Sequence, residues 1–313
     1  MRSPVEHAPL PPNSLVICTR NRPRLVWQAV ESVLSGTELP TELIVVDQSE
    51  VPHAQLASLA DRGDCQVRYV WMHTVGASRA RNHGASVAQH AIVAFIDDDM
   101  LVAPEWYARL IRALVQAGPG SVVTGRVLPG PVEVPRGFVP ALVEGTESRS
   151  HAGRIGTDVL PGCHFALDRL AFLGVGGLDE QLGPGARFPA AEDNDLGFRL
   201  LEAGLRIVYA PECVIYHRAW RSTSAFWPLR WAYGRGQGAF YAKHLSLRDT
   251  HMARRLAWDI GLRTIRFPWR FIHRPRLALA DLVFTVGLVT GCAEWLARHA
   301  LQPASPTARG VRS

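Results

Sequence analysis

Six apolar residues at positions 91–96 run directly into three carboxylates, Asp97, Asp98 and Asp99. The run is too short to cross a membrane, and several of its members are β-branched or aromatic, so it predicts a buried β-strand. A strand that is apolar on both faces is typical of the interior of a largely parallel sheet. The acids then lie at the carboxyl end of the strand, where open α/β sheets bind their ligands.

The three acids suggest a cation site. Along an extended chain, Asp97 and Asp99 would point to one side and Asp98 to the other. Two carboxylates on one side are hard oxygen ligands that suit Mg²⁺ or Mn²⁺. They would repel each other if unpaired, so we expect a cation or a positive substrate group between them. The alternative is that three acids simply end a strand at a solvated turn.

The charge of the chain is distributed unevenly. Residues 1–217 hold 18 arginines and 24 acidic residues, whereas residues 218–313 hold 16 basic and 4 acidic residues. This asymmetry predicts an acidic catalytic body and a basic tail that meets an anionic partner, either nucleic acid or an anionic membrane. The five cysteines are far apart and have no metal-ligand spacing, which fits a reducing, intracellular compartment. We expect no signal peptide, because the proline-rich start lacks an apolar core.

The first elements alternate between strand and helix. Residues 14–19 and 42–47 are apolar runs that predict strands, and helical spacing between them predicts a helix over 23–36. Such a segment is a βαβ unit. Asp47 would then lie beside the end of the first strand, in the crevice where a nucleotide could bind. The alternative is an aspartate that only forms a turn.

The pattern continues toward the centre of the chain. We predict helices over 54–60, 76–84 and 104–115, strands over 66–71 and 121–127, and a long loop over 129–157. Arg79 and Arg81 are either surface charges or clamps for a diphosphate.

A second acidic cluster follows. Glu192, Asp193 and Asp195 precede residues of helical spacing and therefore crowd a helix N-terminus. The helix dipole favours acids there, but three exceed what capping needs, so one could serve as a general base. Further on, short strands predicted over 205–210 and 213–216 end at His217, which is either a packed histidine or a metal ligand.

An ordered set of short motifs resembles the family 2 inverting glycosyltransferases of GT-A fold over residues 12–218. The set comprises the loop Thr19, Arg20, Asn21 and Arg22, then Asp47, Arg81 with Asn82, Asp97–Asp99, Gly176 to Asp179, Glu192 with Asp193, Asp195 and Arg199, and His217. Each piece is weak alone, and the order and spacing of the set carry the resemblance.

The resemblance implies a Rossmann-like α/β fold with a mostly parallel sheet flanked by helices and a C-terminal helical extension. It also implies a nucleotide-sugar donor and bound Mg²⁺ or Mn²⁺. The implied donor-binding residues are Thr19, Arg20, Asn21, Arg22, Asp47, Arg81, Asp97 and Asp98; the implied metal ligands are Asp97, Asp99 and His217; the implied catalytic base is Asp193, with Glu192 as neighbour or substitute. At Cys163-His164 the chain departs from the Gly-Asn or Ala-Asn of relatives, so His164 could alter contacts with the acceptor.

The implied chemistry agrees with these residues. Sugar transfer creates charge on a departing diphosphate, which a divalent cation held by Asp97 and Asp99 would stabilise, with help from Arg81. The acceptor hydroxyl loses a proton as it attacks, and Asp193 would accept that proton. One base without a protein nucleophile predicts inversion at the anomeric carbon. The chain shows no Ser-His-Asp arrangement and no P-loop motif.

We expect three parts: a flexible segment over 1–11, the catalytic domain over 12–218, and a basic, aromatic helical extension over 219–313. Residues 282–293 are only twelve uncharged residues, too few for an ordinary transmembrane helix. An in-plane amphipathic helix with Arg and Trp anchors is one interpretation, and a soluble helical cap is the other. Membrane attachment would place a cytoplasmic enzyme on the inner face of the membrane, near a lipid-linked or cell-envelope glycan acceptor.

Two other functions fit parts of the sequence. A sugar nucleotidyltransferase would need a glycine-rich loop after the first strand, and the loop over 19–23 has no glycine. A non-enzymatic nucleic-acid-binding protein could use the basic, aromatic tail but would leave both acidic clusters unexplained. We therefore expect no nucleic-acid partner.

Overall fold

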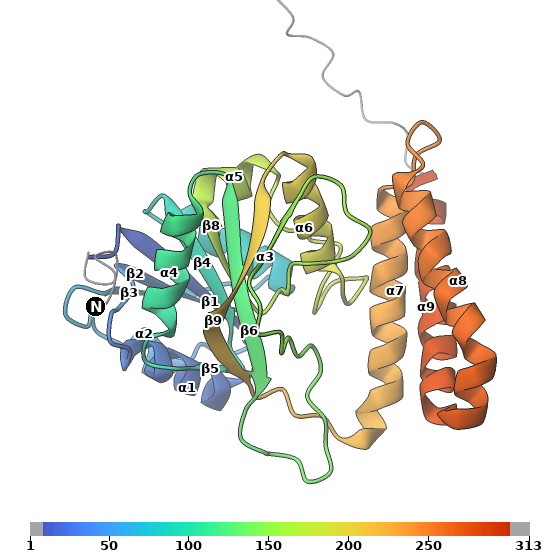
Figure 1. Ribbon diagram of the computed structural model, residues 1–313. Coiled ribbons are helices and arrows are strands. Elements are labelled where there is room, and N and C mark those ends of the chain that lie inside the picture. Colours follow the sequence, from blue (N-terminus) through green and yellow to red (C-terminus); the bar gives the residue numbers. More distant parts are fainter. Residues whose placement is uncertain (1–8, 301–313) are drawn as a thin grey trace, which may run out of the picture. The chain divides into compact units, whose positions relative to one another are not determined.

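The computed structural model describes residues 9–300 (Figure 1). The chain divides into two compact units, one of Met1–Arg187 with Glu192–Phe226 and the other of Phe188–Ala191 with Trp227–Ser313. Most of the segment expected to be flexible, 1–11, and the last residues of the expected extension, 301–313, lie outside the described part.

The first unit is built on a mixed β-sheet with the strand order β3-β2-β1-β4-β8-β6-β9-β5, and β7 pairs with β9. Strands β1 to β4 run parallel to one another, whereas β8 lies antiparallel between β4 and β6. The described strands are β1 Asn13–Thr19, β2 Glu42–Asp47, β3 Gln66–Trp71, β4 Ile92–Asp97, β5 Met100–Val102, β6 Ser121–Pro129, β7 Arg149–Ala152, β8 His164–Asp168 and β9 Arg206–His217. The expected α/β architecture is confirmed.

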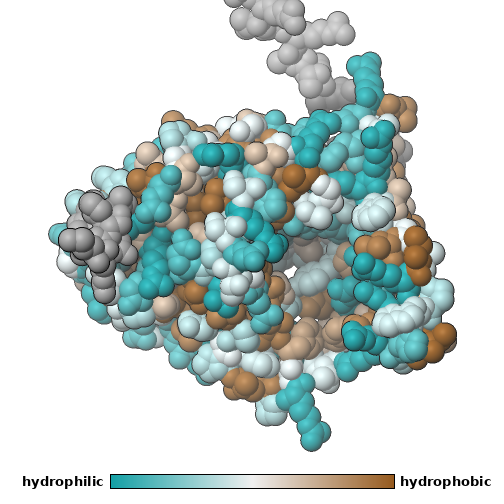
Figure 2. Space-filling view, in the orientation of Figure 1, coloured by the Kyte–Doolittle hydropathy of each residue, from teal (hydrophilic) through white to brown (hydrophobic). Residues whose placement is uncertain are grey.

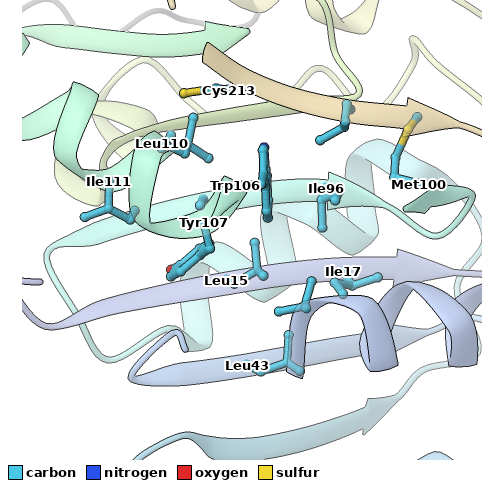
Figure 3. Packing of buried hydrophobic residues seen from close by; sticks show 14 of the residues in the cluster. Leu15, Ile17, Leu43, Ile96, Met100, Trp106, Tyr107, Leu110, Ile111 and Cys213 are labelled. Carbon is cyan, nitrogen blue, oxygen red and sulfur yellow. The ribbon is translucent and has the colours of Figure 1, made fainter. Parts of the chain in front are cut away.

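Helices cover both faces of this sheet (Figure 1). Within β1, Leu15 and Ile17 pack under α1 and α4, and Val16 packs on the other side against α3 and α6. Trp106 and Tyr107 of α4 belong to the hydrophobic core on the side of Leu15 and Ile17 (Figure 3). Both faces of β1 are buried, which explains its continuous apolar sequence. The helices of this unit are α1 Pro23–Leu34, α2 Ala54–Ala57, α3 Ala77–Val87, α4 Trp106–Ala117, α5 Arg169–Gly174 and α6 Glu192–Glu202.

The register of the sheet brings polar strand ends together. Thr19 pairs with Asp47, and Cys18 pairs with Asp97, so β1, β2 and β4 finish side by side. Further along, β5 pairs antiparallel with β9 so that Met100 lies opposite His217. The histidine therefore reaches the segment just after β4, although more than a hundred residues separate the two in sequence.

Three local features differ from the sequence-based expectations. The chain does not stay extended through the acids, because β4 ends at Asp97 and the next two residues form a turn. The region expected to be a long loop contains the edge strand β7. This strand is short and mostly exposed, so its sequence has no hydrophobic pattern that would predict a strand. The two short strands expected before His217 are one strand, β9, whose register against β6 shifts between Gly125 and Arg126. A Cβ at Gly125 would lie 2.2 Å from the carbonyl oxygen of Cys213, so this irregularity needs a glycine.

The second unit consists largely of three helices, α7 Phe226–Lys243, α8 His251–His273 and α9 Pro275–Ala300. Backbones of α7 and α9 touch, because a Cβ at Gly238 would lie 1.9 Å from the carbonyl oxygen of Leu288. The expectation of an apolar helix too short to span a membrane is corrected, since the helix that contains 282–293 has 26 residues. Within the described residues, α9 is the one helix long and apolar enough to cross a membrane, with a mean hydropathy of 1.6 over its best window.

Candidate active site

The acidic turn after β4 is held by two arginines. Arg81 of α3 forms an ion pair with Asp97. Arg22, at the start of α1, contacts Asp98 at 3.0 Å and Asp99 at 3.2 Å. We expected a cation or a positive substrate group between these carboxylates, and the structure instead pairs them with two arginines of the chain itself. Any cation or substrate that binds there must share the acids with these arginines.

Asp99 and His217 face each other. The distance between His217 Nε2 and Asp99 Oδ1 is 3.6 Å, and both side chains are 8% exposed. His217 Nδ1 is buried with no hydrogen-bond partner. Nε2 of His217, which faces Asp99, and the neighbouring carboxylate oxygens are a donor set that suits a divalent cation such as Mn²⁺. The residues therefore fit the expected metal, although among residues 9–300 no three His, Cys, Asp or Glu groups already gather in a metal-binding arrangement.

Burial disfavours the ionised forms of Asp97 and Asp98. Desolvation raises the pKa of Asp98 to about 6, with Asp99 adding to the rise and Arg22 opposing it. Desolvation also raises the pKa of Asp97, against the attraction of Arg81. An added divalent cation would favour the ionised carboxylates and so oppose both the desolvation and the smaller repulsion among the acids.

The second acidic cluster joins the first through Arg81. Its guanidinium, 7% exposed, lies 3.5 Å from Glu192 at the start of α6 while it also pairs with Asp97. Desolvation, followed by the charge of Asp193, raises the pKa of Glu192 to about 7. Asp193 accepts hydrogen bonds from the backbone N–H groups of Gly162 at 3.0 Å and Asn194 at 2.9 Å. A group that titrates near neutral pH beside a fixed carboxylate is suited to proton transfer.

Two glycines make room for this pair. A Cβ at Gly162 would lie 2.8 Å from Cβ of Asp193, and a Cβ at Gly183 would lie 2.8 Å from Cδ of Glu192. Gly183 also has φ of +97°, a conformation that other residues rarely adopt. Each carboxylate therefore has backbone packed directly against it.

The loop after β1 and the end of β2 carry the expected nucleotide-binding residues. Thr19 donates a hydrogen bond to Asp98 at 2.7 Å, which ties this loop to the acidic turn. Arg20 is exposed and lies 3.8 Å from Glu50. Asn21, with φ of +54°, exchanges hydrogen bonds with the same glutamate.

Asp47 lies at the base of this loop and is fully buried. Its carboxylate accepts hydrogen bonds from the Tyr69 hydroxyl at 2.6 Å and from the Ser49 backbone at 2.8 Å. These bonds fit the turn-forming alternative, and a nucleotide ligand would have to share or replace them. Its role in donor binding stays a prediction.

Several residues of the family 2 motifs stabilise the fold and do not contact the acidic turn after β4. Asn82 makes two hydrogen bonds of 2.8 Å with the backbone of Leu178. Arg199 donates to the carbonyl oxygens of Val175 and Gly177 and pairs with Asp195. These contacts link α3, α6 and the glycine-rich turn after α5. Arg79 forms a half-exposed ion pair with Glu180, as the surface alternative expected.

His164 does not reach an acceptor, which corrects the expectation from sequence. It is fully buried in β8, where Trp106 lies 3.3 Å from Nδ1 and the Gly125 N–H donates to Nε2 at 3.2 Å. Desolvation lowers its pKa to about 4, so the imidazole stays neutral in the core. The short strand β8 that carries His164 was not predicted from the sequence.

The sequence reasoning also missed Arg218. Its backbone N–H donates to the carbonyl oxygen of Asp99 at 2.8 Å. Its side chain is buried, pairs with Glu133 and donates to Gln28 at 2.6 Å. It therefore fixes the segment that carries His217 against α1 and the loop after β6. The one sequence feature that could have indicated a role for Arg218 in the site is its position next to His217.

Comparison with known proteins agrees with this architecture. A family model described as glycosyl transferase family 2 matches residues 14–173. The chain is 29% identical over 226 residues to a glucosyl-dolichyl phosphate glucuronosyltransferase of Haloferax volcanii, covering 68% of this chain and 71% of that protein. It is 29% identical over 168 residues to a pre-mycofactocin glycosyltransferase of Mycobacterium tuberculosis, covering 50% of this chain but only 34% of the relative.

Solved structures show the same fold at low sequence identity. The mannosyltransferase PcManGT from Pyrobaculum calidifontis, in complex with GDP-Man and Mn²⁺, has a TM-score of 0.62 at 14% identity, with 93% of this chain and 90% of that chain covered. S. aureus TarS has a TM-score of 0.54 at 16% identity, with 83% of this chain and 44% of that chain covered. The expected GT-A fold is thereby confirmed.

Proposed function

We propose that this chain, which belongs to glycosyl transferase family 2 and is a glycosyltransferase, moves a sugar from a nucleotide-sugar donor to an acceptor hydroxyl with inversion, in a metal-dependent reaction. The family membership decides against the sugar nucleotidyltransferase and the non-enzymatic nucleic-acid-binding protein. The observation that carries the proposal is the chain of ion pairs from Asp97 through Arg81 to Glu192. It connects the carboxylates that would hold a metal to the carboxylates that would supply the general base.

The metal site would consist of Asp97, Asp99 and His217. Mg²⁺ or Mn²⁺ there would act as a Lewis acid that stabilises the negative charge of the departing diphosphate. Arg22 and Arg81 are already aimed at the same acids, and their planar guanidinium groups suit phosphate oxygens. We propose that they orient the diphosphate and add positive charge where the leaving group develops negative charge.

The donor would extend from this turn along the ends of β1 and β2. Thr19, Arg20, Asn21, Arg22, Asp47 and Asp98 would contact the nucleoside part. The hydrogen bond from Thr19 to Asp98 supports this, because it fixes the loop next to the carboxylates that would hold the metal. A donor bound by the loop would therefore lie at a defined position relative to those carboxylates.

Asp193 would accept the proton of the attacking hydroxyl. Its two backbone hydrogen bonds fix the carboxylate in one orientation, as a general base requires. Glu192 would hold Arg81 and tune the charge of the pair. The Cys163 thiol is disfavoured as a nucleophile, because burial raises its pKa well above its usual range. A single displacement by the acceptor gives inversion.

We further propose a glycan or lipid-linked acceptor and a cytoplasmic enzyme that works at the inner face of the membrane. The relative from Haloferax volcanii is named for transfer to a dolichyl-phosphate-linked sugar, which supports a lipid-linked acceptor.

Donor binding tests the metal site. Purified protein is titrated calorimetrically with UDP- and GDP-sugars, with and without Mn²⁺. Asp99→Ala is expected to abolish the part of the donor affinity that depends on the metal, because one ligand of the cation is lost. Glu147→Ala, at a side chain 81% exposed, is the control. Donor binding by Asp99→Ala that still strengthens on adding Mn²⁺ would remove this residue from the site.

Transfer tests the base. Asp193→Asn is expected to bind donor as the wild type does and to transfer sugar at least about a hundredfold more slowly, since general-base catalysis contributes 10²–10⁴. Product analysis reports the anomeric configuration. A variant that transfers at the wild-type rate excludes Asp193 as base, and a retained configuration excludes the single displacement.

A further inference from the structure

The long helix α8 directs four of its six charged side chains, Arg255, Asp259, Arg263 and Arg270, toward the neighbouring helices. Arg255 is 6% exposed, and its guanidinium lies over the rings of Phe240 and Tyr241 of α7. One turn further, Asp259 accepts a hydrogen bond from the Tyr241 hydroxyl and pairs with Arg263. Soluble amphipathic helices normally bury the apolar side and expose the charged side. In α8 these four charged side chains face inward instead, while Arg254 and Arg266 stay exposed.

The opposite side of α8 is apolar and exposed. Trp258, Ile265, Trp269 and Ile272 are spaced by seven, four and three residues, which places them on one face of a helix. They are 70%, 79%, 56% and 75% exposed, respectively. We name these four side chains the outward face of α8. In the view of Figure 2, apolar and polar residues both appear on the surface of the C-terminal helices.

The charges left on the surface of these two helices are of one sign. The acidic residues of α8 and α9 are Asp259, Asp281 and Glu294, and each is in an ion pair with an arginine. None of these acids is classed as exposed, whereas exposed arginines occur along α8, at its junction with α9 and at the end of α9. These exposed arginines are Arg254, Arg266, Arg274, Arg276 and Arg298. Because the acids of α8 and α9 are used in these ion pairs, the exposed charges around the outward face of α8 are positive.

We infer that the outward face of α8 docks on an anionic lipid surface, with the helix lying in the plane of the interface. Its tryptophans and isoleucines would enter the boundary between headgroups and acyl chains, and its exposed arginines would contact lipid phosphates. The six charged residues between Arg254 and Arg270 exclude α8 as a membrane-spanning helix. The proposed function, with its lipid-linked acceptor, gives the enzyme a reason to be at a membrane, and this inference rests on it in that respect. The inference adds which surface of the protein attaches to the membrane.

Vesicle binding tests the inference without donor, acceptor or metal. The full-length protein is floated with vesicles of phosphatidylcholine alone or with about one quarter phosphatidylglycerol. We expect binding to the anionic vesicles. Exchange of Trp258, Ile265 and Trp269 for glutamine is expected to weaken binding at least about tenfold, because the apolar side chains that enter the boundary are lost. Arg254→Gln with Arg266→Gln is expected to weaken binding to anionic vesicles about thirtyfold.

Matched controls separate docking from folding. Leu170→Gln and Val51→Gln change side chains that are 67% and 75% exposed in the other unit, and they are expected to bind vesicles as the wild type does. Circular dichroism and thermal melting show whether the α8 variants fold. Wild-type binding by a folded triple variant, or equal binding to neutral and anionic vesicles, overturns the inference. So does a wild-type dimer that becomes a monomer in the triple variant, because the outward face would then be an interface between two copies. Sugar transfer to a soluble acceptor is measured separately, so loss of vesicle binding with intact transfer leaves the proposed function standing.

Discussion

Exchange of Glu192 for glutamine is expected to stabilise the protein in a pH-dependent manner. Glutamine has the shape of the protonated carboxyl but cannot ionise. The pKa of Glu192 is raised from 4.5 to about 7, chiefly by desolvation at the start of α6. In the unfolded chain the same carboxyl releases its proton at lower pH, so the folded state loses stability relative to the unfolded state as the pH rises through this window.

The magnitude follows from the two pKa values. A pKa raised from 4.5 to about 7 corresponds to a destabilisation of about 3 kcal/mol once the pH exceeds the folded value. Near pH 5 the same linkage gives less than about 1 kcal/mol. The stability of Glu192→Gln relative to wild type should therefore increase by about 2 kcal/mol between about pH 5 and pH 8. A constant offset is allowed, because an amide and a protonated carboxyl offer different hydrogen bonds to their neighbours.

Urea denaturation at several pH values measures this difference by linear extrapolation. Glu147→Gln, at a side chain 81% exposed, serves as the control and should follow the wild type at every pH. An offset between Glu192→Gln and wild type that does not change with pH would refute the reasoning, because Glu192 would then titrate alike in both states.

Two further predictions concern packing and burial. Gly238→Ala is expected to lower the free energy of unfolding by about 1–3 kcal/mol, because its Cβ would lie 1.9 Å from the Leu288 carbonyl oxygen. Gly261→Ala meets nothing within 4 Å and should stabilise α8 by up to about 1 kcal/mol; denaturant titration of both variants in parallel checks the pair, and equal effects would contradict the close helix contact. His164→Asn is expected to remove an acid sensitivity of about 2 kcal/mol between about pH 7 and pH 5, because the pKa of the buried imidazole is lowered to about 4 while the unfolded chain takes up a proton. Unfolding curves at the two pH values test it, and an identical fall in stability for variant and wild type would show that His164 is not the group involved.

Much of the fold could be predicted because apolar runs mark buried strands. Strands β1, β2 and β4 are covered on both faces, so their sequences are continuously apolar and end where the polar site begins. By contrast, β7 is a four-residue edge strand with mostly exposed side chains, and nothing in its sequence distinguishes it from a loop. Its position depends on pairing with β9, a contact between distant parts of the chain.

The site was predictable in composition but not in contacts. The acids and His217 were identified from strand and helix ends, and the structure brings Asp99 and His217 to 3.6 Å. The turn at Asp98 was missed because strand periodicity assumes an extended chain. The ion pairs of Arg22 and Arg81 connect residues that are 76 and 16 positions apart, so only the folded sheet reveals them.

The two glycines that contact the acidic pair limit how the pocket could be redesigned. A side chain at Gly162 or Gly183 would push directly on Asp193 or Glu192. Loop grafting intended to accept a different alcohol should therefore keep both positions bare and vary the sequence around them. Most members of a library that randomises these two glycines would carry a side chain that displaces Asp193 or Glu192.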